Sequence, residues 1–401
     1  MAKTERLYYA DCYLREFEAR VLRSEAAPNG FKVYLDRTAF YPASGGQPMD
    51  SGTLADLEVL EVVDEGEEIA HLLRQVPEGE SVTGKIAWTR RFDHMQQHTG
   101  QHILSAAFER IGGYKTVSFH LGEESSSIDL DSDRLGLRQL EEAEDAANQV
   151  VFEDRPVRIS FQPAGEAGKM ELRKPTAREG EIRLVEVEGF DFSACGGTHV
   201  NRTGAVGLIL LRKVERMKGL TRVEFVCGGR ALRQARRDFK LLNEAALLFS
   251  AAPETLPELI AKQSQELREG MRGREKLLER LAEYQAREVW QETPAFEGRR
   301  TVRRIFPAEE SAQVKKLAHA LAKQPGTVAL LGIKGQPTKL FFAQTPGGPS
   351  EMSNVLKQTV AKFGGKGGGR RDFAQGGGLE ESRLEEALAW AEVFLAGEPT
   401  A

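Results

Sequence analysis

The 401-residue sequence is short of cysteine and of long apolar runs, and each shortage narrows the class of protein. Its three cysteines, Cys12, Cys195 and Cys227, are too few and too odd in number for a disulfide framework. Each is therefore a thiol, a buried apolar side chain or a metal ligand. No run of about eighteen apolar residues is present to span a membrane, and the N-terminal residues lack the apolar stretch of a secretory signal. We expect a cytoplasmic protein without a membrane partner.

The sequence also lacks a large excess of charge of one sign. Its 55 Lys and Arg residues and 60 Asp and Glu residues give a formal net charge of -5. This argues against a general polycation, although a nucleic-acid partner requires only a local basic patch. Three basic clusters are candidates for such a patch, and each can equally be an ordinary solvated face. They are Arg212, Lys213, Arg216 and Lys218; Arg230, Arg233, Arg236 and Arg237; and Lys362, Lys366, Arg370 and Arg371.

Length and residue patterning predict an α+β protein of several domains, because a chain this long exceeds what one hydrophobic core usually supports. Short β-branched and apolar runs predict a small β-barrel or sandwich, and we expect an N-terminal β-barrel over residues 1–90. A helix over 91–111, followed by strands and a second helix, predicts an α+β domain over 91–230.

The C-terminal part of the chain changes in composition. Residues 231–293 are rich in Leu, Ala, Glu, Gln, Lys and Arg, which predicts a helical spacer with a broken heptad rhythm. Strands and helices alternate over residues 294–401, which predicts a separate α/β domain. A homodimer contact through the spacer or the C-terminal domain is one further expectation.

Two pairs of metal-binding residue types stand out. His98 and His102 are four residues apart on the predicted helix, so both side chains lie on one face. In "CGGTH" the two glycines let the backbone turn sharply and bring Cys195 and His199 to one point. One cysteine and three histidines suit tetrahedral zinc, and we expect about one zinc ion per chain.

The ligand count bears on the role of this zinc. Four protein ligands favour a structural ion, since a catalytic zinc usually keeps one position open. Thr99 stands where an H-E-x-x-H metalloprotease has its glutamate, which argues against that chemistry. His94, one turn before His98, is open to three interpretations: a helix-surface residue, a partner of a ligand, or a substrate contact.

These motifs resemble those of a known family. "HTGQH" (98–102) followed by "CGGTH" (195–199) resembles the zinc motif of the editing domain of alanyl-tRNA synthetases and of the free-standing AlaX trans-editing proteins. The resemblance extends to "LDRTAFYPASGGQPMDSG" (35–52) and to "TGAVGLILLRKVERMKGLTRVEFVCGGRAL" (203–232). In addition, "FGGKGGGRRDFAQGGG" (363–378) is similar to the glycine-rich loop of the domain that ends alanyl-tRNA synthetases and occurs in DHH-type phosphoesterases.

The resemblance implies a zinc-dependent deacylase that hydrolyses serine or glycine wrongly attached to alanine tRNA. It assigns His98, His102, Cys195 and His199 as zinc ligands. It places Gln47 in the pocket, where the amide would bond the substrate or water, and Thr38 offers a hydroxyl for the serine side chain. Ordinary turn and strand roles for these two residues stay open. Ser44 departs from the family's three glycines before the glutamine.

For the tRNA partner, the expected contacts are Lys366, Arg370, Arg371, Arg212 and Lys213. Backbone N–H groups of the glycine-rich loop would also approach phosphate closely. Two other functions stay open: a non-catalytic tRNA-binding protein with a structural zinc, and a nucleotide phosphoesterase. The phosphoesterase would require an aspartate- and histidine-rich metal domain, and the sequence contains no D-H-H triplet. Only a handful of residues precede the predicted barrel, where a synthetase would place its aminoacylation domain, so we expect the protein not to charge tRNA.

Overall fold

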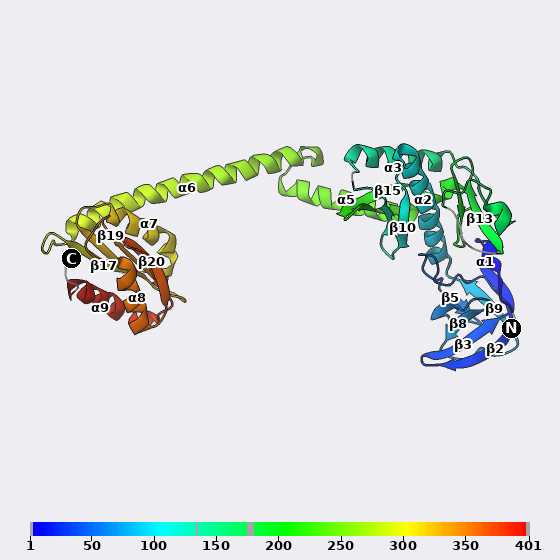
Figure 1. Ribbon diagram of the computed structural model, residues 1–401, viewed down its shortest axis with the longest axis horizontal. Helices are drawn as coiled ribbons and strands as arrows, with labels where there is room; N and C mark the ends of the chain where they lie inside the picture. The colour runs from blue at the N-terminus through cyan, green and yellow to red at the C-terminus, as the bar shows by residue number, and fades with distance from the viewer. Residues whose placement is uncertain (1–2, 134, 175–179, 398–401) are drawn as a thin grey trace. The chain divides into compact units, whose positions relative to one another are not determined.

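The computed structural model describes residues 3–133, 135–174 and 180–397 of the chain (Figure 1). Contacts divide the chain into two compact units, Met1–Ala245 and Ala246–Ala401. The predicted boundaries near residues 90, 230 and 293 remain predictions. None of the described helices is both long and apolar enough to cross a membrane.

The N-terminal part of the first unit is a seven-stranded antiparallel sheet in the order β6-β5-β9-β2-β3-β8-β7. Its long strand β2 pairs with β9 through its first half and with β3 through its second half, with an irregularity between Val21 and Arg23. Among the described residues the strand order has two ends, β6 and β7, so the predicted closed barrel is not confirmed. The strands are β2 (Glu16–Ala27), β3 (Gly30–Leu35), β5 (Gly52–Leu54), β6 (Leu57–Glu58), β7 (Glu61–Asp64), β8 (Ile69–Leu73) and β9 (Ser81–Ile86).

A short N-terminal segment lies beside this sheet. Strand β1 (Glu5–Arg6) pairs in parallel with β4 (Arg37–Thr38), and the single-turn helix α1 (Leu7–Ala10) follows directly. Alternating buried side chains such as Val33, Leu35 and Leu54 form the core of the sheet. In β3 the consecutive residues Val33, Tyr34 and Leu35 are all buried, so side chains on both faces of this strand are covered.

Helix α2 (Trp88–Gly112) forms the centre of the first unit and is buried along most of its length. It ends at Gly113, whose φ of +70° is the left-handed conformation that glycine adopts without strain. At Gly100 a β-carbon would lie 2.3 Å from the Cys227 sulfur, so the helix packs this closely only because glycine stands there. Cys227 is accordingly a buried packing residue.

Two further sheets flank α2. The first has the order β10-β11-β16-β15, and helix α3 (Leu137–Phe152) also packs against α2. The second has the order β12-β13-β14, and the segment after β14 carries "CGGTH". The strands are β10 (Thr116–Leu121), β11 (Ser126–Leu130), β15 (Ile209–Met217), β16 (Leu220–Cys227), β12 (Val157–Pro163), β13 (Glu181–Val187) and β14 (Asp191–Ala194), with the short elements α4 (Ala164–Ala167) and η1 (Thr203–Val206).

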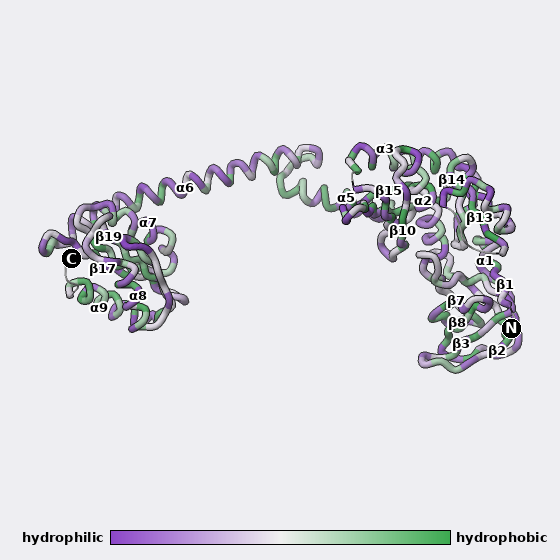
Figure 2. Tube along the Cα trace, in the orientation of Figure 1, coloured by the Kyte–Doolittle hydropathy of each residue, from purple (hydrophilic) through white to green (hydrophobic). Residues whose placement is uncertain are grey.

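The residues from α5 onward include the predicted spacer. Helix α5 (Gly228–Leu248) and helix α6 (Leu256–Glu292) are separated by a 3-10 turn, η2 (Pro253–Thr255), which begins at Pro253. Near its end α6 packs against α7 through Ala282, Ala286 and Val289. Figure 2 shows that most of α6 is hydrophilic. A homodimer contact along this helix remains a prediction.

The second unit contains a five-stranded sheet in the order β17-β18-β19-β21-β20. Only β17 and β18 are parallel, and the other neighbouring pairs are antiparallel. The predicted α/β domain is thus a mixed sheet covered by helices. Its strands are β17 (Arg300–Phe306), β18 (Thr327–Ile333), β19 (Lys339–Gln344), β20 (Lys366–Arg370) and β21 (Phe373–Gly377), and its helical elements are η3 (Ala308–Glu310), α7 (Ser311–Ala322), α8 (Met352–Phe363), η4 (Glu381–Arg383) and α9 (Leu384–Gly397).

The segment predicted as a glycine-rich loop forms a hairpin, so that prediction is wrong. Strands β20 and β21 pair along residues 366–377 at the edge of the sheet, where α8 packs on them. A β-carbon at Gly367 would lie 2.8 Å from the Gly376 Cα and 2.9 Å from a Leu356 methyl. The glycines therefore allow the hairpin and α8 to approach closely, instead of making the segment a loop.

A buried ion pair joins the N-terminal sheet to α2. Arg91 and Asp50 are both 0% exposed, and the Arg91 Nε lies 2.9 and 3.0 Å from the two carboxylate oxygens. The guanidinium also donates to the carbonyl oxygens of Cys12 and Ala39, at 3.0 and 2.5 Å. All three nitrogens of this cation thus donate hydrogen bonds, which hold three chain segments at the start of α2.

We predict that Arg91→Met destabilises the first unit by about 3–5 kcal/mol, because it leaves the Asp50 carboxylate buried without its partner. The measurement is urea unfolding followed by Trp88 fluorescence in a chain whose Trp290 and Trp390 are replaced by phenylalanine. The control is Arg138→Ala, which removes an exposed pair with Glu142 and should leave the midpoint almost unchanged. Equal midpoints for Arg91→Met and the parent chain would contradict this role.

Candidate metal centre and adjoining pocket

The structure brings the four predicted metal ligands together. His98 and His102 project from successive turns of α2, and Cys195 and His199 come from the segment after β14. Their ligand atoms all lie within 4.8 Å of one another. The Cys195 sulfur is 3.4 Å from the His98 Nε2 and 3.3 Å from the His199 Nε2.

These distances and donor types fit zinc. With Zn–N bonds of about 2.0 Å and a Zn–S bond of about 2.3 Å, ligand atoms of a tetrahedral site are about 3.3–3.5 Å apart. The two sulfur–nitrogen separations match that length. A soft thiolate with three imidazoles is also a donor set that zinc accepts. The residues present therefore suit one zinc ion.

Each histidine is held through the ring nitrogen that points away from the centre. The His98 Nδ1 lies 2.8 Å from the Gln47 Oε1, the His102 Nδ1 lies 2.8 Å from an Asp191 carboxylate oxygen, and the His199 Nδ1 lies 3.1 Å from the Thr99 hydroxyl. The amide oxygen and the carboxylate are acceptors, so the first two Nδ1 atoms carry the proton. All three Nε2 atoms then remain as metal donors.

The charges at the centre favour the ligand form of the cysteine. Burial raises the pKa of Cys195, but the nearby His98 and His199 outweigh it and hold the pKa well below its ordinary value. Burial lowers the pKa of His102, yet its hydrogen bonds to Asp191 and Cys195 raise that pKa to about 9. Burial and the neighbouring His98 lower the pKa of His199 to about 3. A thiolate is thus stabilised beside a neutral His199 and a protonated His102, whose Nε2 would release its proton on binding a metal.

Gln47 supports the centre from the glycine-rich turn. Its side chain is buried, and its Oε1 accepts from the Thr198 backbone N–H at 3.1 Å as well as from His98. Its Nε2 donates to the Thr198 hydroxyl at 2.9 Å. Gln47 is absent from the pocket wall as the described residues define it. The amide oxygen expected to bond the substrate or water is instead engaged with His98 and Thr198, so Gln47 positions a ligand.

Thr38 and His94 lie away from the pocket. Thr38 is 0% exposed in β4, and its hydroxyl bonds His71 at 2.8 Å and the Phe40 N–H at 3.1 Å. The structure therefore places it in the two-stranded β1–β4 pair, and it is not among the described residues that line the pocket. His94 is 2% exposed, so the surface interpretation is wrong. Its Nδ1 has no hydrogen-bond partner among the described residues.

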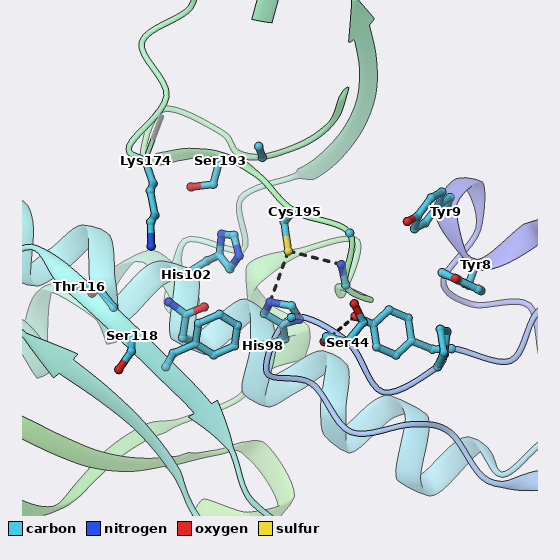
Figure 3. A pocket seen from close by; sticks show the side chains of 18 of the residues that line it. Tyr8, Tyr9, Ser44, His98, His102, Thr116, Ser118, Lys174, Ser193 and Cys195 are labelled. Carbon is cyan, nitrogen blue, oxygen red and sulfur yellow. Dashed lines mark hydrogen bonds between the residues drawn. The ribbon is translucent and has the colours of Figure 1, made fainter. Parts of the chain in front are cut away.

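A pocket opens beside the metal ligands (Figure 3). Tyr8 and Tyr9 of α1 form one side, Thr116 and Ser118 of β10 another, and Lys174 reaches in from the segment between α4 and β13. Ser44 also borders it, in a tight turn closed by two hydrogen bonds with Gln47. Since Gly45 and Gly46 carry the positive φ values of this turn, a serine at position 44 is tolerated. Among the residues that the structure describes, the wall is formed by Arg6, Tyr8, Tyr9, Tyr41, Pro42, Ser44, Gly45, Asp64, His98, Gln101, His102, Thr116, Val117, Ser118, Phe119, Arg173, Lys174, Ser193, Ala194, Cys195, Gly196 and Gly197.

Several residues of the site were not predicted from the sequence. Asp191 is 4% exposed, holds His102 and is itself bound by Arg173 at 2.5 Å. In the sequence, Asp191 could have been found only from its position four residues before Cys195, in a strand with alternating burial. Thr99 and Thr198 lie inside the two motifs, and Lys174 lies in a segment without a recognisable pattern.

The residues expected to contact tRNA differ in exposure and in whether a carboxylate pairs with them. Arg212 is paired with Asp238 at 2.5 Å, and Lys213 is paired with Glu215. Lys366, Arg370 and Arg371 are exposed on the β20–β21 hairpin and have no ion pair among the described residues. In the middle cluster, Arg230 is buried against Asp93. Of the five expected contacts, the three on the hairpin are thus the ones without a carboxylate partner among the described residues.

Comparison with known proteins agrees with this geometry. Residues 182–224 match the family described as "Threonyl and Alanyl tRNA synthetase second additional domain", and residues 301–397 match the DHHA1 domain. The chain is 32% identical over 396 residues to "Alanyl-tRNA editing protein AlaX-L" of Pyrococcus horikoshii, covering 93% of this chain and 94% of that protein.

Two other relatives are matched over different lengths. "Alanine--tRNA ligase" of Pyrococcus abyssi is 33% identical over 410 residues, which is 97% of this chain but 43% of that protein. The chain therefore spans less than half the length of this relative. "Alanyl-tRNA editing protein Aarsd1" of Danio rerio is 32% identical over 269 residues, covering 63% of this chain and 65% of that protein.

We predict about one zinc ion per chain and its loss in Cys195→Ala, because that variant removes the only thiolate of the quartet. Asp191→Ala and Gln47→Ala should each bind zinc about 10–100-fold more weakly, since His102 or His98 would lose the partner that orients it. Metal analysis and competition with a zinc-binding dye measure these effects.

Two matched controls accompany these variants. Cys227→Ala removes a buried thiol that faces Gly100, and Asp238→Ala removes an exposed carboxylate, so both should keep full zinc affinity. Two tightly bound ions, or equal zinc loss in Cys227→Ala and Cys195→Ala, would refute the assigned quartet.

Proposed function

The chain belongs to the family of alanyl-tRNA editing proteins, and from this premise we propose that it is a zinc-dependent hydrolase that removes serine or glycine from mischarged alanine tRNA in trans. The observation that carries the proposal is the pocket whose wall includes three of the four metal ligands. A substrate that enters this pocket comes directly against the metal centre. The alignment with the AlaX-L relative covers 93% of this chain and 94% of that protein, so the two chains correspond along nearly their whole length.

Hydrolysis of an aminoacyl ester requires few catalytic groups. An aminoacyl ester is already an activated acyl group, so its hydrolysis requires a placed water and a stabilised oxyanion. Zinc, when bound by the quartet, supplies a positive charge that polarises a carbonyl or lowers the pKa of water. Four protein ligands favour the role of positioning the substrate.

Polar side chains of the pocket are suited to recognise a serine side chain. The Thr116 hydroxyl donates to Ser105 at 2.7 Å, and the Ser118 hydroxyl donates to Asp129 at 2.6 Å, so both oxygens keep lone pairs for an incoming hydroxyl. Both residues border the pocket. A site that pairs with a hydroxyl discriminates against alanine, which would leave the pocket groups unsatisfied. Thr116 and Ser118 therefore take the role first expected of Thr38.

The hairpin of the second unit is proposed to supply tRNA affinity. Lys366, Arg370 and Arg371 carry positive charge on an exposed edge, and phosphate contacts of this kind are independent of sequence. Lys366 also borders a hollow with Lys315 and Lys339. Arg212 and Lys213 are weaker candidates because carboxylates already neutralise them.

Zinc-loaded protein should hydrolyse seryl-tRNA or glycyl-tRNA of the alanine type and leave alanyl-tRNA intact. Cys195→Ala should lower the rate by about two orders of magnitude or more, because the metal charge at the carbonyl is lost. The assay follows release of labelled amino acid with and without a chelator. Tight tRNA binding without hydrolysis by the zinc-loaded chain would support the alternative of a non-catalytic tRNA-binding protein.

The salt dependence of tRNA binding tests the hairpin. Lys366→Ala and Arg370→Ala should each weaken binding and reduce the slope of log affinity against log salt by about one unit or less. Fluorescence anisotropy with uncharged tRNA at several salt concentrations measures this slope. The control Arg138→Ala, an exposed arginine on α3, should keep the parent slope. A hairpin variant with unchanged affinity and slope would remove this role.

A further inference from the structure

A second hollow adjoins the metal pocket at α1. It is lined by residues of β1, α1, β12 and β13, and Phe161 and Arg183 are among them. Arg6, Tyr9 and Gly196 border both hollows. A ligand that is held at the metal centre and extends outward along this path therefore passes Tyr9.

Arg183 fixes the position of Tyr9 relative to the metal ligands. This buried arginine donates from its Nε to the Tyr9 carbonyl at 3.0 Å and from a terminal nitrogen to the Cys195 carbonyl at 2.6 Å. One guanidinium thus bonds the backbone of Tyr9 and the backbone of a metal ligand. Arg6 adds a bond to the Tyr9 hydroxyl at 3.4 Å and is itself held by Asp64 at 2.7 and 2.8 Å.

The Tyr9 ring packs against the buried Tyr8 in a T-shaped arrangement and remains partly exposed. The two ring centroids are 5.0 Å apart, with an interplanar angle of 79°. The guanidinium carbons of Arg6 and Arg183 lie over the ring at 5.6 and 5.5 Å from its centroid, farther than the 3.6 Å of Arg23 over Tyr34. At these distances they add cation–π attraction without the close stacking that Arg23 makes on Tyr34. Figure 3 shows the Tyr9 ring beside Tyr8 at the side of the pocket.

The charges around the outer hollow favour a nucleobase over a phosphate group as its occupant. Lys3, Arg6 and Arg183 of the outer hollow are balanced by Glu5, Glu67 and Glu181. Attraction for an RNA backbone is therefore weak there, whereas stacking on an aromatic ring needs no net charge. Single-stranded RNA ends present unstacked bases that aromatic side chains receive.

We propose that Tyr9 is the stacking platform for the terminal adenine of the tRNA acceptor end. In an aminoacyl-tRNA only the terminal ribose separates this base from the ester carbonyl, and in the protein one arginine side chain separates the Tyr9 backbone from Cys195. The stacked base would thus fix the ester at the metal centre, whichever amino acid it carries. This inference rests on the proposed function, because it concerns the same substrate.

The test measures the affinity of the zinc-loaded full chain for two uncharged acceptor-stem minihelices ending in CCA. One carries the terminal adenine and the other an abasic nucleotide at that position. The parent chain should bind the abasic RNA between about 5-fold and 150-fold more weakly, the range of base stacking on an aromatic residue. Tyr9→Ala should bind both RNAs at the level of the abasic one, and Tyr9→Phe should behave like the parent.

Phe152→Ala is the matched control, since this exposed aromatic ring ends α3 outside both hollows. Zinc content and thermal unfolding verify that each variant is folded, and Tyr9→Leu replaces Tyr9→Ala if the latter is not. Equal affinity of the parent for the two RNAs, or full discrimination by the folded alanine or leucine variant, overturns the proposal. Seryl-tRNA hydrolysis by the parent is measured separately, so its absence would contradict the proposed function while the binding comparison still decides the role of Tyr9.

Discussion

The hydrogen bonds behind the three histidines are the constraint on which this site depends. An imidazole offers two nitrogens, and a free side chain can present either to a metal. Gln47, Asp191 and Thr99 each engage an Nδ1, so that the Nε2 atoms converge with the Cys195 sulfur within 4.8 Å. The partners come from three separate parts of the first unit. The ligand geometry is therefore a property of the packed unit and not of the two motifs alone.

The N-terminal part of the chain therefore contributes to the metal centre, although the four ligands come from α2 and from the segment after β14. The turn that carries Gln47 leads to Asp50, which is locked to Arg91 at the start of α2. The same helix carries His98 and His102 two and three turns later. The buried Arg91 guanidinium and the buried Gln47 amide thus fix the position of α2 relative to the segment that follows β4. A shift of the sheet relative to α2 would therefore displace His98, because the Gln47 side chain is hydrogen-bonded to both Thr198 and His98.

The sequence predicted the quartet because helical spacing and the paired glycines are local properties. It also predicted the buried helix and its end near Gly112. It missed Asp191 and Thr99 as partners, since hydrogen bonds between residues 89 or 100 positions apart leave no local pattern. The glycines of residues 363–378 misled the prediction because glycine permits close packing of strands as well as loops, and only the neighbouring α8 decides between them.

X-ray absorption spectroscopy of the zinc-loaded chain reports the ligands of the metal itself. We expect one sulfur at about 2.3 Å and nitrogen scattering from imidazoles at about 2.0–2.1 Å in a four-coordinate site. Asp191→Ala should keep the sulfur and disturb the imidazole signal. A spectrum with no sulfur ligand, or with two or more, would contradict the assigned centre.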